Sequence, residues 1–455
     1  MNKKTDVLIV GAGPAGVVCA TTARKYYPSK SITVMRDVAE GVIPCGIPYM
    51  FASLKNPDEN KLGMAALEQK NIDVIVDKAI KVNREGKTVE TEKGDKYSYE
   101  KLVLAVGSNP IALPIKGIEK QGVYQIKKDM GYLKSVINKI KECKNVLVIG
   151  GGFIGVEFAD EISKLKNTKV TLVEILPQLL QNSFDSEFSA MVSDKLEQNG
   201  VEVLTGMGVQ EIIGDSSVEK VKLSNGKEMP VDGIILGVGA RPNVQMAVDA
   251  GLELGTCKGV LVDEYLRTSI DPDIFAIGDC ACKRDFYTRK GIAVMLASTA
   301  TAEARIAGAN LYKIKLIREN KGTIAVYSTY IDGLVLGSAG LTEKTAEKEG
   351  FETLVGSTDG VDKHPASLPG AHKSKMKLIF SRQSGIILGG QVSCSMSCAQ
   401  MINIIGIAIQ KRMSCTELET LQVATHPYLT SAPTTYPVIL AAQDVSDLPP
   451  SLSQL

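Results

Sequence analysis

The sequence predicts an α/β fold in which two strand–glycine turn–helix–strand units precede a C-terminal α+β domain. Segments 6–35 and 145–173 share one order: a short apolar strand, a glycine-rich turn, a helix and a second strand. Strands that alternate with helices in this way are typical of parallel sheets. From about Thr323 onward, alternating segments such as 323–330 and 375–380 indicate antiparallel strands. The 455 residues suffice for two to four domains.

The balance of charges excludes two classes of partner. The chain has 52 basic and 51 acidic residues, so no electrostatic field favours nucleic acid or an anionic membrane. Apolar runs are too short for a transmembrane helix, and the run 7–10 is too short for a signal peptide. The nine cysteines are an odd number, which indicates reduced thiols. We therefore expect a cytoplasmic protein without a membrane or nucleic-acid partner.

The first unit carries a glycine-rich turn between its strand, 6–10, and its helix. The turn consists of Gly11, Ala12, Gly13, Pro14, Ala15 and Gly16. Such glycines let the backbone approach a pyrophosphate, which then lies at the N-terminus of the helix. A single turn of this kind can also serve only to pack a helix against a strand. At the end of the next strand, Met35 occupies the position where an acidic residue would bind a ribose, and Arg36 follows.

The second unit repeats this order after the strand 145–149. Its turn consists of Gly150, Gly151, Gly152, Phe153, Ile154 and Gly155. Its second strand ends at Glu174, whose carboxylate suits the ribose hydroxyls of NADH and would repel the 2′-phosphate of NADPH. An exposed glutamate at a strand end is the alternative. Because both turns follow a strand and open a helix, we expect two Rossmann-like dinucleotide-binding domains, with NADH rather than NADPH at the second.

A third motif follows the apolar strand 273–277. It is Gly278-Asp279, which can place a carboxylate at the carboxyl edge of a parallel sheet, where ligands bind. Taken alone, the motif could be an ordinary turn. Further along the chain, a helix is expected near 399–411.

The order of these motifs resembles that of the FAD-dependent pyridine nucleotide–disulfide oxidoreductases over essentially the whole chain. The segments that carry the resemblance are 11–16, 104–110, 150–155, 237–242 and 275–279. The resemblance implies FAD at the first turn, where Arg36, Gly107 and Asp279 would contribute. It implies NADH at the second turn, where Gly239 would contribute and Phe153 would lie near the nicotinamide as a gate. Val106 departs from the family, which usually has threonine there.

The resemblance also implies the division into domains. A discontinuous FAD-binding domain would comprise 1–116 and 245–322, and an NAD(H)-binding domain would comprise 117–244. A dimerisation domain would comprise 323–455, so a homodimer is expected.

One cysteine, Cys45 in the segment Pro-Cys-Gly-Ile-Pro-Tyr, separates branches of this family. Disulfide reductases with two redox cysteines have the second one where Glu40 stands. The chain therefore resembles the single-cysteine branch of coenzyme A disulfide reductases, NADH oxidases and peroxidases, and persulfide or polysulfide reductases. Pro48 suits the first turn of a helix, and a thiol at a helix N-terminus has its pKa lowered from about 8.5. Tyr49 is expected to contact the substrate.

Other residues bear on the substrate. Oxidases and peroxidases of this branch carry a histidine in the first turn, whereas this chain has none before His364. In coenzyme A disulfide reductases a basic residue that contacts the coenzyme would fall near Arg24 or Lys25, so coenzyme A is a candidate ligand. A solvated helix end is the alternative for this pair.

A C-terminal segment, 425–431, completes the resemblance. In the family, it reaches over the flavin of the other subunit, so His426 or Tyr428 would face Cys45 there. A structural histidine is the alternative. A second aromatic that coenzyme A disulfide reductases use would fall near 366–368, where no tyrosine occurs.

The remaining cysteines are interpreted as structural. Cys394 and Cys398 would share a helical face as a redox pair or by packing, and their spacing is not usual for zinc, so no metal is expected. Cys280 and Cys282 follow the Gly-Asp motif.

Three functions remain open on the sequence. The first is an NADH-dependent flavoenzyme that reduces a disulfide, persulfide or polysulfide through Cys45. The second is an NADH oxidase or peroxidase in which Cys45 passes through a sulfenate. The third is a subunit that transfers electrons between NADH, flavin and a partner redox protein.

Overall fold

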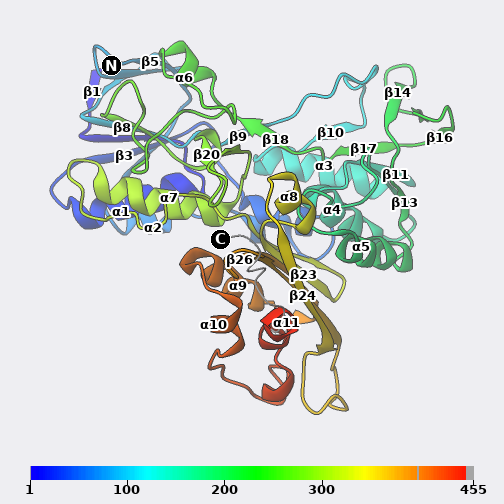
Figure 1. Ribbon diagram of the computed structural model, residues 1–455. Coiled ribbons are helices and arrows are strands. Elements are labelled where there is room, and N and C mark those ends of the chain that lie inside the picture. The colour runs from blue at the N-terminus through cyan, green and yellow to red at the C-terminus, as the bar shows by residue number, and fades with distance from the viewer. Residues whose placement is uncertain (1, 397–398, 447–455) are drawn as a thin grey trace. The chain divides into compact units, whose positions relative to one another are not determined.

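The computed structural model describes residues 2–396 and 399–446, which form two compact units (Figure 1). The first unit comprises the chain up to Leu113, Gln125–Ile140 and Gly239–Thr323. The second comprises Pro114–Tyr124, Lys141–Val238 and the chain from Ile324 onward. The predicted NAD(H)-binding and dimerisation domains thus fall mostly in one unit, and the three-domain division stays a prediction.

A five-stranded sheet of order β19-β8-β2-β3-β4 forms the centre of the first unit, and its neighbouring strands are parallel. Its strands are β2 (Val7–Val10), β3 (Ile32–Arg36), β4 (Asp73–Val76), β8 (Lys101–Leu104) and β19 (Ile274–Ala276). Val7 and Ile9 belong to one buried cluster, and Leu8 and Val10 to another. Because both faces of the sheet are covered, β2 can be apolar throughout instead of alternating.

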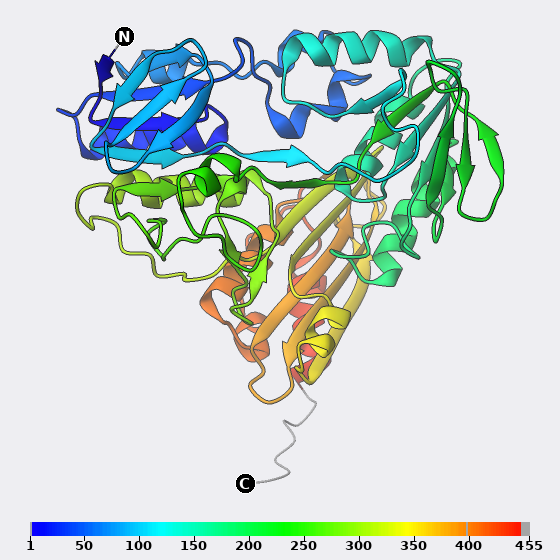
Figure 2. The ribbon, with the colours of Figure 1, turned by 90° about the horizontal axis from the view of Figure 1, so that it is seen from above.

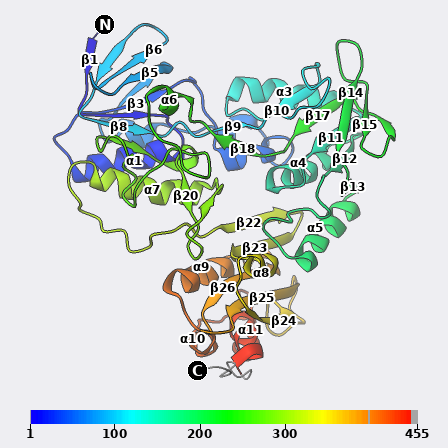
Figure 3. The same cartoon turned by 45° about the horizontal axis from the view of Figure 1, so that its top comes forward.

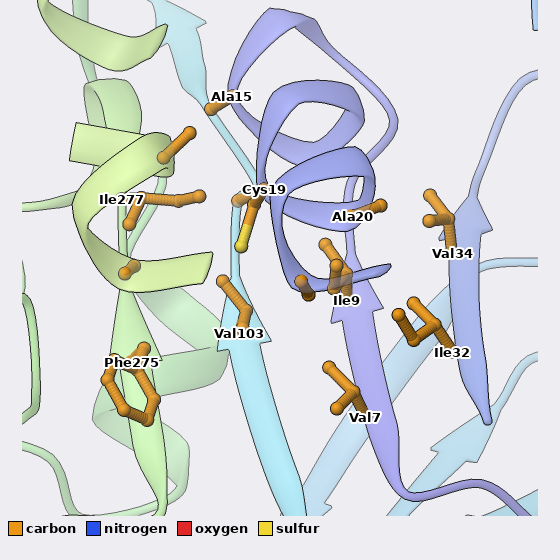
Figure 4. Close-up of a cluster of buried hydrophobic side chains, with 14 of the residues drawn as sticks. Val7, Ile9, Ala15, Cys19, Ala20, Ile32, Val34, Val103, Phe275 and Ile277 are labelled. Carbon is orange, nitrogen blue, oxygen red and sulfur yellow. The ribbon is translucent and has the colours of Figure 1, made fainter. Parts of the chain in front are cut away.

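Two helices, α1 (Pro14–Tyr26) and α7 (Ala297–Asn310), pack side by side (Figure 3). Cys19 and Ala20 of α1 lie in the same cluster as Val103 of β8 and Phe275 of β19 (Figure 4). Small residues on α1 therefore allow the helix to lie close to the sheet, and the helix begins at Pro14.

The first unit also contains a four-stranded sheet of order β1-β7-β6-β5 and two pairs, β9–β18 and β20–β21. Their bounds are β1 (Asn2–Lys4), β5 (Ala79–Asn83), β6 (Thr88–Thr91), β7 (Lys96–Ser98), β9 (Ser108–Pro110), β18 (Ala240–Pro242), β20 (Lys283–Arg284) and β21 (Gly291–Ile292). The short helices are α2 (Ala65–Glu68), α6 (Gln245–Asp249) and the 3-10 helices η1 (Pro44–Gly46), η2 (Pro48–Met50), η3 (Pro57–Asn60) and η4 (Gly278–Cys280).

The second unit repeats the parallel design in a sheet of order β10-β17-β11-β12-β13. Its strands are β10 (Val123–Gln125), β11 (Asn145–Ile149), β12 (Lys169–Val173), β13 (Glu202–Leu204) and β17 (Gly233–Leu236), accompanied by α4 (Phe153–Ser163) and α5 (Ser186–Gln198). A small antiparallel sheet contains β14 (Val209–Ile213), β15 (Lys220–Leu223) and β16 (Glu228–Pro230). Helix α3 (Met130–Glu142) precedes β11 in the chain, and its residues up to Ile140 belong to the first unit.

The C-terminal part of the second unit is an antiparallel sheet of order β22-β23-β26-β25-β24, drawn in yellow and orange in Figure 2. Its strands are β22 (Val326–Ile331), β23 (Leu334–Gly340), β24 (Thr353–Val361), β25 (Lys373–Ser381) and β26 (Ile387–Cys394). The helices of this part are α8 (Glu343–Lys348), α9 (Met401–Lys411), α10 (Cys415–Glu419) and α11 (Pro437–Ser446), with the 3-10 helix η6 (Pro433–Thr435). The predicted fold class, with parallel sheets followed by an α+β domain, is confirmed.

One face of this sheet receives helices because glycines leave room for them. A Cβ at Gly337 would meet Ile402 of α9, and a Cβ at Gly356 would meet the backbone of Ala441 in α11. The opposite face carries polar residues that contact the loop before α5: Gln391 donates to Asp185, and Lys377 forms an ion pair with it at 3.1 Å. The sheet therefore packs on both faces within the second unit.

Across the described ranges, every helix is too short or too polar to cross a lipid bilayer.

Candidate active site

The first glycine turn has a geometry that only glycine permits at its two ends. Gly11 has φ +112°, and a Cβ there would lie 2.1 Å from the Ala105 carbonyl oxygen. A Cβ at Gly16 would lie 1.9 Å from the Gly11 carbonyl oxygen. At Gly13, by contrast, no described atom lies within 4 Å of a Cβ. The end glycines thus close the turn, and the middle glycine leaves open space where α1 begins.

Asp279 lies in η4, just beyond the carboxyl end of β19 in the same sheet. Ser108, which follows β8, donates a hydrogen bond of 2.8 Å to the Asp279 carboxylate. The Lys128 ammonium lies 3.7 Å from that carboxylate and 3.4 Å from the Ser108 hydroxyl. Gly107 allows this approach with φ +69°. Sequence reasoning missed Ser108 and Lys128, since nothing in the local pattern connects them to the Gly-Asp motif.

A buried ion pair fixes the turn that presents Asp279. The Glu303 carboxylate of α7 accepts a hydrogen bond of 2.8 Å from the Gly278 N–H, and the Lys283 ammonium donates to the Gly278 carbonyl at 2.5 Å. The two charged groups lie 3.6 Å apart, and their side chains are 4% and 2% exposed. Burial raises the pKa of the Glu303 carboxyl, and the Lys283 charge opposes that rise.

The residues of the first unit fit a bound FAD. The glycine turn forms an open cradle at a helix N-terminus, and Asp279 supplies a fixed carboxylate on the same sheet edge. Arg36, at the end of β3, is 7% exposed, and its Nε has no acceptor among the described residues. A buried donor without an acceptor is what a ligand oxygen could satisfy.

The second glycine turn has the same build. Gly150 has φ +108°, a Cβ at Gly155 would lie 1.7 Å from the Gly150 carbonyl oxygen, and a Cβ at Gly152 would meet no described atom within 4 Å. Helix α4 begins at Phe153, and Ile154 is 40% exposed. These residues provide the same cradle for a second dinucleotide.

Glu174, at the end of β12, is held by backbone groups. Its carboxylate accepts hydrogen bonds from the Gly151 N–H at 2.5 Å and from the Leu176 N–H at 2.7 Å. The carboxylate is thus fixed beside the glycine turn.

Gly239 was expected to contribute to the NADH site, but it belongs to the first unit. Its carbonyl accepts a hydrogen bond from the Ile111 N–H at 3.2 Å there.

Sequence reasoning missed a half-buried carboxylate on α4. Glu157 lies one helical turn after Phe153, and burial raises its pKa to about 7 although the Thr329 hydroxyl donates to it at 2.9 Å. The signal was available, since a glutamate between Val156 and Phe158 interrupts an apolar stretch.

Cys45 lies in a tight, exposed turn. The segment forms two one-turn 3-10 helices: Cys45 is the second residue of η1, and Pro48 is the first residue of η2, as expected for a proline in the first turn of a helix. An α-helix starting at Pro44 would need the N–H of residue 48, and Pro48 has none. The Ile47 N–H donates to the Pro44 carbonyl instead. The local dipole is that of a single turn rather than of a full helix.

Asn60 contacts both ends of the Cys45 segment. Its side-chain amide donates to the Ile43 carbonyl at 3.0 Å and contacts the Met50 sulfur at 3.2 Å. A Cβ at Gly46 would lie 1.9 Å from the Asn60 side-chain oxygen. Gly46 is therefore needed for close packing, and Tyr49 lies half-buried beside it.

Arg24 and Lys25 have different surroundings. The Arg24 guanidinium donates to the backbone carbonyls of Pro28, Lys30, Lys70 and Asn71. Lys25 is exposed and lies over the Tyr26 ring at 5.6 Å. Of the two candidates for a coenzyme phosphate contact, Lys25 keeps its charge accessible.

The loop of His426 and Tyr428 has a defined hydrogen-bond pattern. The Tyr428 N–H donates to Nδ1 of His426 at 3.3 Å, so in the neutral imidazole the proton is on Nε2. Tyr428 is 53% exposed. His364 supports the loop, because its N–H donates to the Pro427 carbonyl and its Nδ1 lies 2.9 Å from the Thr430 carbonyl. His364 was not predicted to contribute.

The sequence predicted that all the cysteines are reduced thiols, and some of them form disulfides instead. Cys257 and Cys282 form a disulfide with Cα atoms 5.8 Å apart, and Cys394 is also disulfide-bonded. Cys398 lies outside the described residues. Gly255 and Gly259 let the loop of Cys257 approach Cys282, a long-range contact that spacing does not reveal. Cys280 is buried, and burial raises the pKa of its thiol to about 11.

Comparison with known proteins identifies the family. Residues 5–304 match the pyridine nucleotide-disulphide oxidoreductase family, and residues 326–437 match the dimerisation domain of that family. The chain therefore belongs to the pyridine nucleotide-disulphide oxidoreductases. Membership implies an oxidoreductase that uses FAD and NAD(P)H, and the dimerisation domain supports a homodimer.

Particular relatives divide between two chemistries. An NADH oxidase of Methanocaldococcus jannaschii is 29% identical over 454 residues, which cover 96% of this chain and 98% of the relative. An NAD(P)H coenzyme A polysulfide/persulfide reductase of Pyrococcus horikoshii is 28% identical over 403 residues, covering 86% and 88%. The solved structure of an NAD-dependent persulfide reductase from A. fulgidus has a TM-score of 0.89 at 29% identity, covering 97% of this chain and 82% of that one.

Proposed function

We propose that the protein is an NADH-dependent flavoenzyme that reduces a disulfide, persulfide or polysulfide through Cys45. The observation that carries this proposal is the exposed Cys45 in a one-turn 3-10 helix of the unit that contains the FAD cradle. The turn of that cradle has Pro14 and Ala15 where an oxidase would have a histidine. The names of the Pyrococcus and A. fulgidus relatives support sulfur chemistry.

In this mechanism the Cys45 thiolate attacks the sulfur–sulfur bond of the substrate. A mixed disulfide forms, and the sulfur that leaves takes one proton. FAD, when bound, would supply the electron pair from NADH that opens this mixed disulfide and regenerates the thiolate. Lys25 and Tyr49 would hold the substrate, with coenzyme A as one candidate. In a homodimer, His426 of a second copy would donate a hydrogen bond from Nε2 to the leaving sulfur, which takes its proton from water, and Tyr428 would donate a second hydrogen bond.

The test is the intact mass of the anaerobically purified holoenzyme, measured with and without reductant and mapped to single cysteines. The proposal expects a reductant-labile sulfur or coenzyme A adduct on Cys45 after incubation with polysulfide or coenzyme A disulfide. An unmodified Cys45 after both incubations would contradict it.

An NADH oxidase is the second candidate, because the Methanocaldococcus relative carries that name. Cys45 would then alternate between thiolate and sulfenate. A Cys45 adduct of one oxygen after exposure to air, together with no sulfur adduct, would favour this candidate.

Coenzyme choice gives a prediction at Glu174. The Glu174→Gln variant is expected to shift the preference from NADH toward NADPH by about tenfold, because the neutral amide no longer repels a 2′-phosphate. Steady-state kcat/KM with both coenzymes measures the shift. Glu202→Gln is the matched control, since Glu202 begins the neighbouring strand β13 and contacts Thr171 instead of the glycine turn. An unchanged ratio in Glu174→Gln would remove Glu174 from coenzyme selection.

A further inference from the structure

Two side chains of helix α4 contact two side chains of strand β22 in the antiparallel sheet. Phe153 and Glu157 are four residues apart, so they share a helix face, whereas Tyr327 and Thr329 are two apart and share a strand face. The Phe153 ring stacks on the Tyr327 ring with centroids 4.9 Å apart and planes at 20°. The Thr329 hydroxyl donates to the Glu157 carboxylate at 2.9 Å. All four residues lie in the second unit.

Both contacts are at least half-buried. Thr329 is 4% exposed, and burial raises the pKa of the Tyr327 phenol. Phe184 adds a second ring 6.1 Å from Phe153. A stacked ring and a partly buried hydrogen bond each restrict the orientation of their partner, so β22 restrains the side chains of the first turn of α4.

We propose that Tyr327 and Thr329 are positioning residues for the NADH site, acting through the Phe153 ring and the Glu157 carboxylate. The inference rests on the proposed NADH site at the second glycine turn. Phe153 is the first residue after the open position at Gly152, so the Tyr327 stack sets where its ring stands when the coenzyme enters. The nicotinamide becomes positively charged when it gives up hydride, and an ionised carboxylate on this helix face favours that charge.

The groups around Glu157 determine in which direction loss of the Thr329 hydroxyl should change the Glu157 pKa. Asp160 and Glu161 on the same helix raise its pKa, and both are paired with Lys164, at 2.8 and 2.6 Å. Asp332, just after β22, is paired with Lys195 of α5 at 2.9 Å. The Thr329 hydroxyl is the group that lowers the Glu157 pKa. Its removal should therefore raise that pKa, so that ionisation requires a higher pH.

The experiment measures the rate of flavin reduction by NADH in the holoenzyme between pH 5 and 9. For Thr329→Val we expect the rising limb of this profile to move upward by about one pH unit, whereas Thr329→Ser should retain the original profile. Thr171→Val is the matched control, because it removes another partly buried Thr–Glu hydrogen bond, of 3.1 Å, in the same unit. If the Thr329→Val variant does not retain FAD, Thr329→Ala replaces it in the experiment, because alanine also lacks the hydroxyl.

The Tyr327 variants are tested by the same flavin-reduction assay at a single pH, with the NADH concentration varied to obtain the affinity for NADH. Tyr327→Leu is expected to weaken NADH binding about tenfold, and Tyr327→Phe, which keeps the ring, to leave it unchanged. If the Thr329 and Tyr327 variants lower the melting temperature but leave the pH profile and NADH affinity unchanged, the contacts are only structural and the inference fails. If the native enzyme itself is not reduced by NADH, the proposed function fails with it.

Discussion

Replacement of Cys45 by serine is expected to lower sulfur-dependent NADH oxidation at least about 1,000-fold. A serine hydroxyl is far less acidic than a thiol and cannot form the mixed disulfide through which electrons reach the substrate. The reduction of bound FAD by NADH should remain, because Cys45 belongs to the acceptor side of the reaction. Anaerobic consumption of NADH with polysulfide or coenzyme A disulfide measures the first effect, and the bleaching of the flavin absorbance measures the second.

Cys143→Ser is the matched control for this experiment. Cys143 is also a thiol, but it lies in the second unit, and burial raises its pKa to about 11. Its replacement should leave both half-reactions within about twofold of the native enzyme. If Cys45→Ser retained sulfur reductase activity at that level, reduction would proceed without a Cys45 adduct, and the proposed mechanism would be wrong.

The parts of the structure that the sequence predicted well are those encoded by neighbouring residues. Gly11 and Gly150 each follow an apolar strand and open a helix, and this local order defined both cradles and the parallel sheets. At Cys45 the local sequence predicted a helix start, and the structure has two one-turn 3-10 helices there, because Pro48 cannot supply the N–H that an α-helix from Pro44 requires.

The parts that could not be predicted depend on contacts between distant segments. Lys128 meets Asp279, and Thr329 meets Glu157, only after separate elements have packed. Spacing along the chain carries no information on such pairs. A single sequence could suggest Glu157 from its apolar neighbours, but its partner required the structure.

Two glycines of the second turn should separate the requirements of folding from those of coenzyme binding. In Gly155→Ala the new methyl would lie 1.7 Å from the Gly150 carbonyl oxygen, so the backbone must shift. We expect a loss of about 3 kcal/mol in the free energy of unfolding, together with loss of NADH binding. In Gly152→Ala the methyl meets no described atom within 4 Å, and φ is −76°, which alanine adopts easily. This variant should lose less than about 1 kcal/mol, the cost of a poorer helix cap.

The Gly152 methyl would instead occupy the space left open at the start of α4, where a pyrophosphate would approach the helix. We therefore expect the Gly152→Ala variant to bind NADH at least about tenfold more weakly while its melting temperature stays close to that of the native protein. Thermal unfolding and NADH titration of both variants, each loaded with FAD, measure the two quantities. Equal NADH affinity in Gly152→Ala and the native enzyme would show that the open space is not where the coenzyme lies. The second glycine turn would then serve only to pack α4 against its sheet.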